Sequence, residues 1–231
     1  MQELALSVGE PFTSPAFNAN FVVFAGELGN VIAQENSEEY LRKVCRYAKH
    51  YGVYLVPERF VLLGYHCLCL ISPLGEVIGA QKAAFLNSAQ KAAPKRSTSL
   101  EVFSTEFGSI FLCVDVDIYR PEVTRIACNM GAQIIISVQQ INRGDYAGNM
   151  VVLGGWNAAQ QNGVYVIGVS NQFNCVCAPI TLTTHQDGFV VPPNLKLPLT
   201  AKLNAGLLRD LPRRLPLNRK LLAVHREDLL I

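Results

Sequence analysis

The chain has 231 residues, of which 50% are hydrophobic and 16% charged, and its formal net charge is +2. This apolar content is enough to bury a large core, which excludes an intrinsically disordered protein. The charges are nearly balanced and form no long basic run, which argues against nucleic acid or an anionic membrane as a partner. No stretch is long enough to span a membrane, and the opening residues, MQEL, lack the basic and apolar regions of a secretory signal. We therefore expect a single cytoplasmic domain over residues 1–231.

The pattern of apolar residues predicts helices that alternate with pairs of strands. Short apolar runs predict strands at 21–24 and 53–57, and helical spacing predicts a helix over 38–51 that ends at Gly52. The other expected strands are 60–71, 76–80, 100–107, 110–116, 133–138, 164–170 and two within 175–191; helices are expected at 121–130 and 154–162, turns at 73–75 and 108–109, a loop at 87–99 and a proline-interrupted tail at 195–231. This mixture suits either one mixed sheet or two sheets with helices outside them.

The seven cysteines form neither a disulfide framework nor a metal site in this reading. Cys67 and Cys69 lie two residues apart, as do Cys175 and Cys177, so each pair is expected on one face of a strand. Zinc sites prefer Cys-x-x-Cys turns with further ligands. The flanking residues here are those of strand interiors, so we expect buried, reduced thiols.

Residues 108–122, with the sequence GSIFLCVDVDIYRPE, contain the strongest functional signal. An apolar strand ends there in a polar turn, and Pro121 is placed to open a helix. Polar side chains at the carboxyl end of a buried strand lie where α/β folds place their chemistry. Cys113 and Asp115 are the candidates, and the alternation of side chains along a strand predicts that both lie on one face, with Cys113 deeper.

This segment resembles the nucleophile region of the nitrilase superfamily, the carbon–nitrogen hydrolases. In that family a strand delivers a cysteine, an aspartate follows two residues later, and a Pro-Glu pair opens a helix. Four further blocks resemble the family in the same order, namely 20–24 with a following acidic residue, 75–86, 156–171 and 207–216. The resemblance implies an α-β-β-α sandwich, usually a homodimer through its helical face, with the tail at 195–231 packed on the domain or on the partner. It implies no cofactor.

The family uses a glutamate as general base, a lysine that stabilises the tetrahedral oxyanion, and the cysteine as nucleophile toward an amide or nitrile carbon. Lys82 matches the lysine, because it follows a hairpin strand and precedes Phe85. Such a lysine would be desolvated and would need a carboxylate partner. Glu27 matches the glutamate only after a shift of one residue, since an ungapped match places Gly26 there.

The position of the family's cysteine falls on Asp115. Counting from Gly108, from Pro121 and from Gly131 gives the same result, and Asp117 then matches the following aspartate. Cys113 would reach the position only with two extra residues in the turn. An aspartate is a much weaker nucleophile toward an amide than a thiolate is, and next to Lys82 it would form a buried ion pair.

Two main functions follow from the resemblance. In the first, the chain is a binding or scaffolding protein without the usual cysteine-dependent hydrolysis, and a pocket bounded by Lys82, Asp115 and Glu27 holds a small amide-like or carboxylate ligand. In the second, it is an active amidase acting on non-peptide C–N bonds, with Cys113 as nucleophile, Lys82 as oxyanion stabiliser and Glu27 as general base. A third possibility is a hydrolase in which Asp115 activates water.

Overall fold

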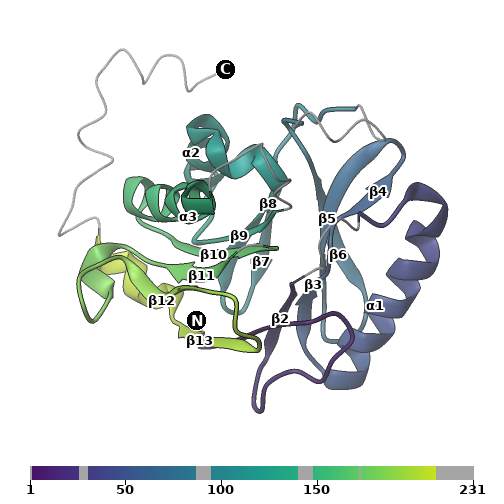
Figure 1. Ribbon diagram of the computed structural model, residues 1–231, viewed down its shortest axis with the longest axis horizontal. Coiled ribbons are helices and arrows are strands. Elements are labelled where there is room, and N and C mark those ends of the chain that lie inside the picture. Colours follow the sequence, from purple (N-terminus) through teal and green to yellow (C-terminus); the bar gives the residue numbers. More distant parts are fainter. Residues whose placement is uncertain (1, 26–30, 87–94, 140–147, 172, 212–231) are drawn as a thin grey trace.

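Two β-sheets lie face to face, and helices cover their outer faces (Figure 1). The arrangement comes from a computed structural model that describes residues 2–25, 31–86, 95–139, 148–171 and 173–211. It confirms the predicted α-β-β-α sandwich. Within these residues, no helix is both long enough and apolar enough to cross a membrane.

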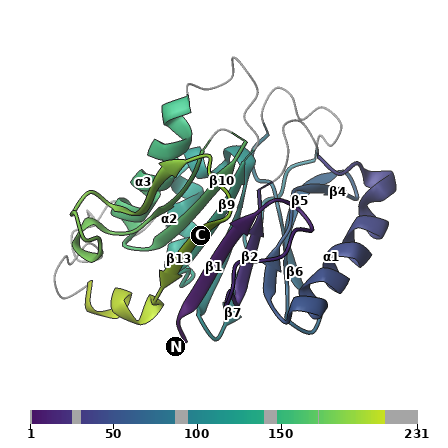
Figure 2. The ribbon, with the colours of Figure 1, turned by 60° about the horizontal axis from the view of Figure 1, so that its bottom comes forward.

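The first sheet has seven strands in the order β13-β1-β2-β3-β5-β4, with β6 paired to β5. Its strands are β1 (Leu4–Gly9), β2 (Phe21–Phe24), β3 (Tyr54–Val56), β4 (Phe60–Leu62), β5 (Tyr65–Ile71), β6 (Val77–Lys82) and β13 (Leu199–Leu203). Strands β1, β2 and β3 are parallel neighbours. Helix α1 (Ser37–Tyr51) packs on the outer face of this sheet (Figure 2).

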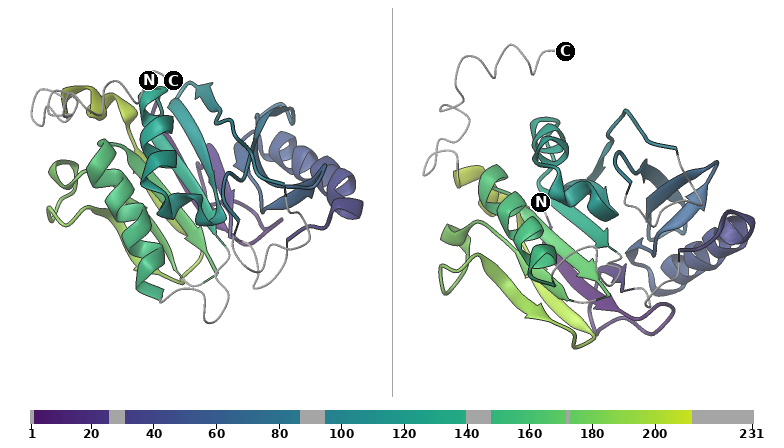
Figure 3. Two further views of the ribbon diagram at one scale, coloured as in Figure 1. Left: turned by 90° about the horizontal axis from the view of Figure 1, so that it is seen from above. Right: turned by 45° about the horizontal axis from the view of Figure 1, so that its top comes forward.

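The second sheet has six strands in the order β12-β11-β10-β9-β8-β7. They are β7 (Val102–Thr105), β8 (Gly108–Val114), β9 (Ile134–Gln139), β10 (Tyr165–Ser170), β11 (Asn174–Cys177) and β12 (Phe189–Asn194). Strands β8, β9 and β10 are parallel. Helices α2 (Pro121–Asn129) and α3 (Gly148–Asn162) cover the outer face (Figure 3). The 3₁₀ helices are η1 (Gln34–Asn36), η2 (Asp115–Tyr119), η3 (Ile180–Leu182) and η4 (Ala205–Asp210).

Three apolar clusters hold the layers together. The largest lies between the two sheets and includes Phe21 and Leu112. The second lies between β8–β11 and the helices α2 and α3, and the third lies under α1. Leu112 and its neighbour Phe111 belong to different clusters, because successive side chains of a strand point to opposite faces. Long apolar runs such as β8 are therefore buried on both sides, as expected for parallel strands covered by helices.

The elements that periodicity marked clearly are confirmed, but several boundaries are wrong. The helix expected at 154–162 begins at residue 148, and the strand expected at 110–116 ends at residue 114. Helix α1 ends at Gly52, whose φ of 63° places it in the left-handed region. The expected strand at 60–71 is divided into β4 and β5 by Leu63 and Gly64, which both have positive φ and form a two-residue turn. The turn expected at 108–109 lies two residues earlier, at 106–107, since Thr105 pairs with Gly108. Most of the loop expected at 87–99 lies outside the described residues, which resume at residue 95.

Two strands were not predicted at all, and they pair with each other. Strand β1 lies near the start of the chain, and β13 lies within the expected tail at 195–231. They form an antiparallel pair at one end of the first sheet, with Leu4 opposite Leu203. The tail thus contributes a strand to this domain as far as it is described; residues 212–231 lie outside the described part.

Gly79 allows the two sheets to approach each other closely. It lies on β6, and a Cβ atom there would collide with the ring of Phe103 from the opposite sheet. We expect Gly79→Ala to lower the free energy of unfolding by about 2 kcal/mol, as overpacking of a core does. Gly9→Ala is the matched control, because its Cβ would lie 3.6 Å from the Thr13 hydroxyl, an ordinary contact. Urea denaturation measures both; equal effects would contradict the explanation.

Candidate functional site

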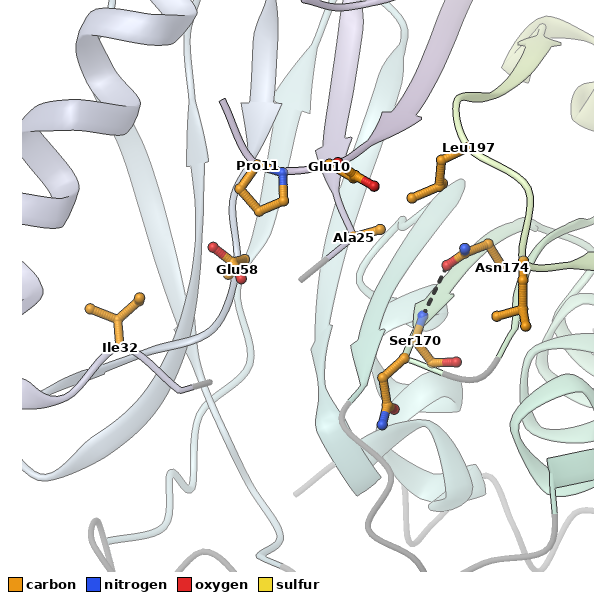
Figure 4. A pocket seen from close by; sticks show the side chains of 10 residues that line it. Glu10, Pro11, Ala25, Ile32, Glu58, Ser170, Asn174 and Leu197 are labelled. Atoms are coloured by element: carbon orange, nitrogen blue, oxygen red, sulfur yellow. Dashed lines mark hydrogen bonds between the residues drawn. The ribbon is translucent and has the colours of Figure 1, made fainter. Parts of the chain in front are cut away.

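A pocket of about 430 Å³ opens at the carboxyl ends of the parallel strands of both sheets (Figure 4). Glu10, Ala25 and Glu58 follow β1, β2 and β3, while Ser170 ends β10. The carboxyl edge of parallel strands is where α/β folds usually bind ligands. The two sheets thus supply opposite walls of one pocket.

Asp115 lies at the sharp turn that joins β8 to η2 and α2. Its φ of 52° is in the left-handed region, which aspartate tolerates better than most residues. A strained residue between a strand and a helix is the arrangement that α/β hydrolases use to present a nucleophile. The backbone therefore gives Asp115 the position expected from the sequence, at the end of the strand, and buries its side chain to 1% exposure.

The Asp115 carboxylate forms an ion pair with Arg59, at 2.6 Å between Oδ2 and Nη1. Arg59 lies between β3 and β4, so the pair joins the two sheets. Both side chains are almost completely buried, at 5% and 1% exposure. Burial lowers the pKa of Arg59 and the charge of Asp115 opposes that shift, which means that each charge depends on the other.

Asp117 ties the same turn to the end of β6. Its two carboxylate oxygens accept the backbone N–H groups of Ala84 and Phe85, at 3.0 and 2.8 Å. The side chain is fully buried. Burial is the largest cause that raises its pKa to about 7, and the two backbone hydrogen bonds oppose it. The carboxyl group of Asp117 is thus poised to change its charge near neutral pH.

Cys113 lies within β8, completely buried in the cluster under α2 and α3. Burial and the nearby Asp117 and Asp115 carboxylates raise the pKa of the Cys113 thiol well above its ordinary value. The expectation that Cys113 and Asp115 share a face is wrong. The left-handed backbone at Asp115 turns the chain out of the strand, so Asp115 faces Arg59 of the other sheet, whereas Cys113 faces the helices.

Lys82 is the last residue of β6, and its side chain is exposed to solvent. Its ammonium lies 4.8 Å from the centroid of the Tyr65 ring, a cation–π contact. Within the described residues Lys82 forms no ion pair, and Arg59 is the cation that pairs with Asp115. The sequence predicted a desolvated Lys82, but the side chain is exposed. Lys82 pairs with Cys67 on β5, whose side chain lies on the α1 side of the first sheet, away from the second sheet. Glu27 lies outside the described residues.

Glu58 links the pocket to the buried ion pair, because it precedes Arg59 and lines the pocket wall. The Tyr40 hydroxyl of α1 donates to its carboxylate at 3.2 Å and accepts its backbone N–H at 3.1 Å. Burial, and then the charge of Glu58, raise the pKa of Tyr40. These bonds hold Glu58 at the pocket while Arg59 points toward Asp115.

Sequence reasoning missed Glu10, Glu58 and Arg59. The available signal was the position of each directly after an apolar strand-like run, as for Asp115. Nothing in the sequence indicated which charges would meet, since the partners come from different sheets. Among the described residues, no group of three or more histidine, cysteine or acidic side chains is placed to hold a metal ion.

Comparison with known proteins finds similarity in structure alone. No protein-family model matches the chain, and no curated protein matches its sequence. A carbon–nitrogen hydrolase from Helicobacter pylori G27 has a TM-score of 0.79 at 15% identity, covering 100% of this chain and 99% of that one. Nit3 of Saccharomyces cerevisiae, a member of branch 10 of the nitrilase superfamily, has a TM-score of 0.74 at 14% identity, covering 95% and 97%.

An amidase from Nesterenkonia sp. is also similar, with a TM-score of 0.68 at 18% identity over 95% of this chain and 96% of that one. The match extends over nearly the whole length of all three proteins, so it includes both sheets and the helical layers. With this similarity and the strand order described above, the chain has the four-layer α-β-β-α fold of the carbon–nitrogen hydrolases of the nitrilase superfamily.

Proposed function

We propose that this protein binds a small molecule at the carboxyl edge of its sheets and lacks the cysteine-dependent amide hydrolysis of the carbon–nitrogen hydrolases. The observation that carries the proposal is the buried pair of Asp115 with Arg59 at 2.6 Å. It occupies the strand-to-helix turn where the resemblance implies a nucleophilic cysteine. A carboxylate held by a buried guanidinium is a poor nucleophile, because attack would require the pair to be broken.

The similar Nesterenkonia amidase makes the contrast clear. In a variant of that amidase, the acetamide moiety of fluoroacetamide is added covalently at the active-site cysteine. Cys113 in the present chain is fully buried, and its pKa is raised by burial and by two carboxylates. A thiolate is the reactive form of cysteine. A raised pKa keeps the thiol protonated and burial keeps substrate away from it, which argues against an active amidase with Cys113 as its nucleophile.

Thiol labelling and ammonia release test the proposal together. We expect iodoacetamide at neutral pH to leave Cys113 unmodified in the folded protein and to modify it after denaturation. The half-buried Cys45 and Cys128 serve as internal controls for partial access. Butyramide, which binds to a variant of the Nesterenkonia amidase, is the amide to incubate with the protein. Stoichiometric labelling of Cys113 together with enzymatic release of ammonia would overturn the proposal.

A further inference from the structure

Strand β11 carries two thiols that the proposed function does not use. Cys175 and Cys177 lie on the face of the strand that packs under α3, and their side chains are 2% and 0% exposed. Their Sγ atoms are 3.9 Å apart, within reach of an S–H···S hydrogen bond. A disulfide needs about 2.0 Å between its sulfurs, so a movement of about 1.9 Å would join this pair.

The backbone of β11 is able to follow that movement. Residues two apart in a strand have Cα atoms about 6.6 Å apart, close to the upper limit for a disulfide. The pairing of β11 with β12 is irregular and shifts register between Val176 and Cys177. β12 is the edge strand of its sheet (Figure 1), and its Pro192 and Pro193 have no N–H groups for the ladder. Bending β11 on that side therefore breaks few hydrogen bonds.

Two glycines lie next to the sulfurs and leave space for them. Gly168 of β10 pairs with Cys175, and a Cβ atom there would lie 3.2 Å from the Cys175 Sγ. Gly155 of α3 faces Cys177, with 3.9 Å between the position of its Cβ and the Cys177 Sγ. The sulfur–sulfur hydrogen bond lowers the pKa of Cys175 and raises that of Cys177; burial opposes the first shift and adds to the second. Because the thiolate is the form that peroxides oxidise, Cys175 is the thiol that reacts first.

The second Cys-x-Cys pair of the chain is arranged differently. Cys67 and Cys69 have the same spacing on β5 and are both completely buried. The Cys67 thiol donates to the backbone oxygen of Tyr65 at 3.5 Å, and within the described residues no S–H···S bond joins it to Cys69. Cys67 is also paired on both sides, with Phe60 of β4 and Lys82 of β6. The two pairs thus share a sequence motif but not a geometry.

We propose that Cys175 and Cys177 form a redox site that hydrogen peroxide converts from two thiols into a disulfide. The Cys175 sulfur attacks one peroxide oxygen, the O–O bond breaks, and a sulfenic acid and one water are formed. The Cys177 thiol then attacks that sulfur, the S–O bond breaks, and a second water leaves as the S–S bond forms. Two thiols are oxidised, and one hydrogen peroxide is reduced to two waters.

The position of the pair gives this site access, reversibility and a neighbour of interest. β11 is the second strand from the edge of its sheet, so local opening of β12 admits a small oxidant. A bridge close to the limit of Cα spacing is strained and is readily reduced by dithiols. Asn174, which precedes Cys175, lines the pocket and accepts the backbone N–H of Ser170 at 3.2 Å. The redox site therefore adjoins the pocket wall, although it is independent of the proposed function.

Peptide mapping of the whole folded protein tests the site, because trypsin separates the two thiol pairs. Cleavage after lysine and arginine gives residues 60–82, which contain Cys67 and Cys69, and residues 144–196, which contain Cys175 and Cys177. The protein is treated with hydrogen peroxide at pH 7, then with catalase, and its remaining thiols are alkylated in denaturant before digestion. We expect mass spectrometry to show the bridge in 144–196 forming at least about tenfold faster than in 60–82, and dithiothreitol to reverse it.

Two comparisons show whether the folded arrangement is the cause. In guanidinium chloride both pairs lie in an unfolded chain with the same spacing, and we expect them to form bridges at similar rates. In Cys175→Ser, we expect Cys177 to remain available for alkylation after the same treatment. Equal rates for the two pairs in the folded protein, oxidation of 144–196 to sulfinic acid without a bridge, or no oxidation of 144–196 would overturn the proposal.

Discussion

Replacement of Asp115 by asparagine is expected to lower the free energy of unfolding by about 3 kcal/mol, because it breaks a buried ion pair by removing the carboxylate charge that faces Arg59. Asparagine has nearly the same shape and also tolerates the left-handed backbone at this position, so the change isolates the charge. For a domain of this size such a loss corresponds to a melting temperature lower by roughly 6–12 °C. Urea denaturation followed by circular dichroism measures it.

An exposed ion pair of the same length provides the control. Lys43 and Glu39 of α1 are also 2.6 Å apart, but their side chains are 51% and 64% exposed. Glu39→Gln should therefore change the free energy of unfolding far less than Asp115→Asn does. The double variant Arg59→Met with Asp115→Asn removes both buried charges and should recover at least about 1 kcal/mol relative to Asp115→Asn alone. Strictly additive losses would show that the two side chains do not depend on each other.

The stability of the protein should fall between about pH 4 and pH 7 because of Asp117. The pKa of Asp117 is about 7 in the folded protein, whereas its ordinary value, which applies to the unfolded chain, is 3.8. Between these two pH values the folded state holds a proton that the unfolded state has released. The stabilisation is complete below about pH 4 and is lost as pH rises to 7. With about 1.4 kcal/mol per pH unit, the total change is on the order of 4 kcal/mol.

Asp117→Asn removes this titration while keeping one oxygen to accept a backbone N–H from Ala84 or Phe85. The difference in unfolding free energy between the parent protein and the variant should therefore decrease steadily from pH 4 to pH 7. Urea denaturation at half-unit steps gives this difference curve, and Glu122→Gln, an exposed carboxylate on α2, supplies a curve for comparison. Parallel profiles for parent and Asp117→Asn would contradict a raised pKa at Asp117.

Much of the fold was predictable because each element satisfies a local rule. The apolar runs of β2, β9 and β10 and the helical spacing of α1 and α2 are readable over a few residues. Gly52 and Pro121 mark the end of α1 and the start of α2 for conformational reasons that act within one turn. Strands β1 and β13 escaped prediction because their pairing joins residues almost 200 positions apart.

The site was predictable only in part. Three counts along the sequence placed Asp115 at the strand-to-helix turn, and its left-handed backbone agrees with that position. The family resemblance of residues 75–86 placed Lys82 beside it, yet the side chain of Lys82 is exposed next to Tyr65. A one-dimensional motif specifies the order of residues, whereas the face of a strand that a side chain occupies depends on the pairing register.

The sequence by itself determined the mixed α/β class of the fold, the order of its main elements and the aspartate at the end of β8, and its resemblance to a known family implied the two sheets. The tertiary structure alone decided that Arg59 would neutralise that aspartate, that Cys113 would face the helices, and that Glu10 and Glu58 would line one pocket. The physical reason is that periodicity and turn chemistry act between near neighbours. Charges and pocket walls instead depend on which strands the packing of two sheets brings together.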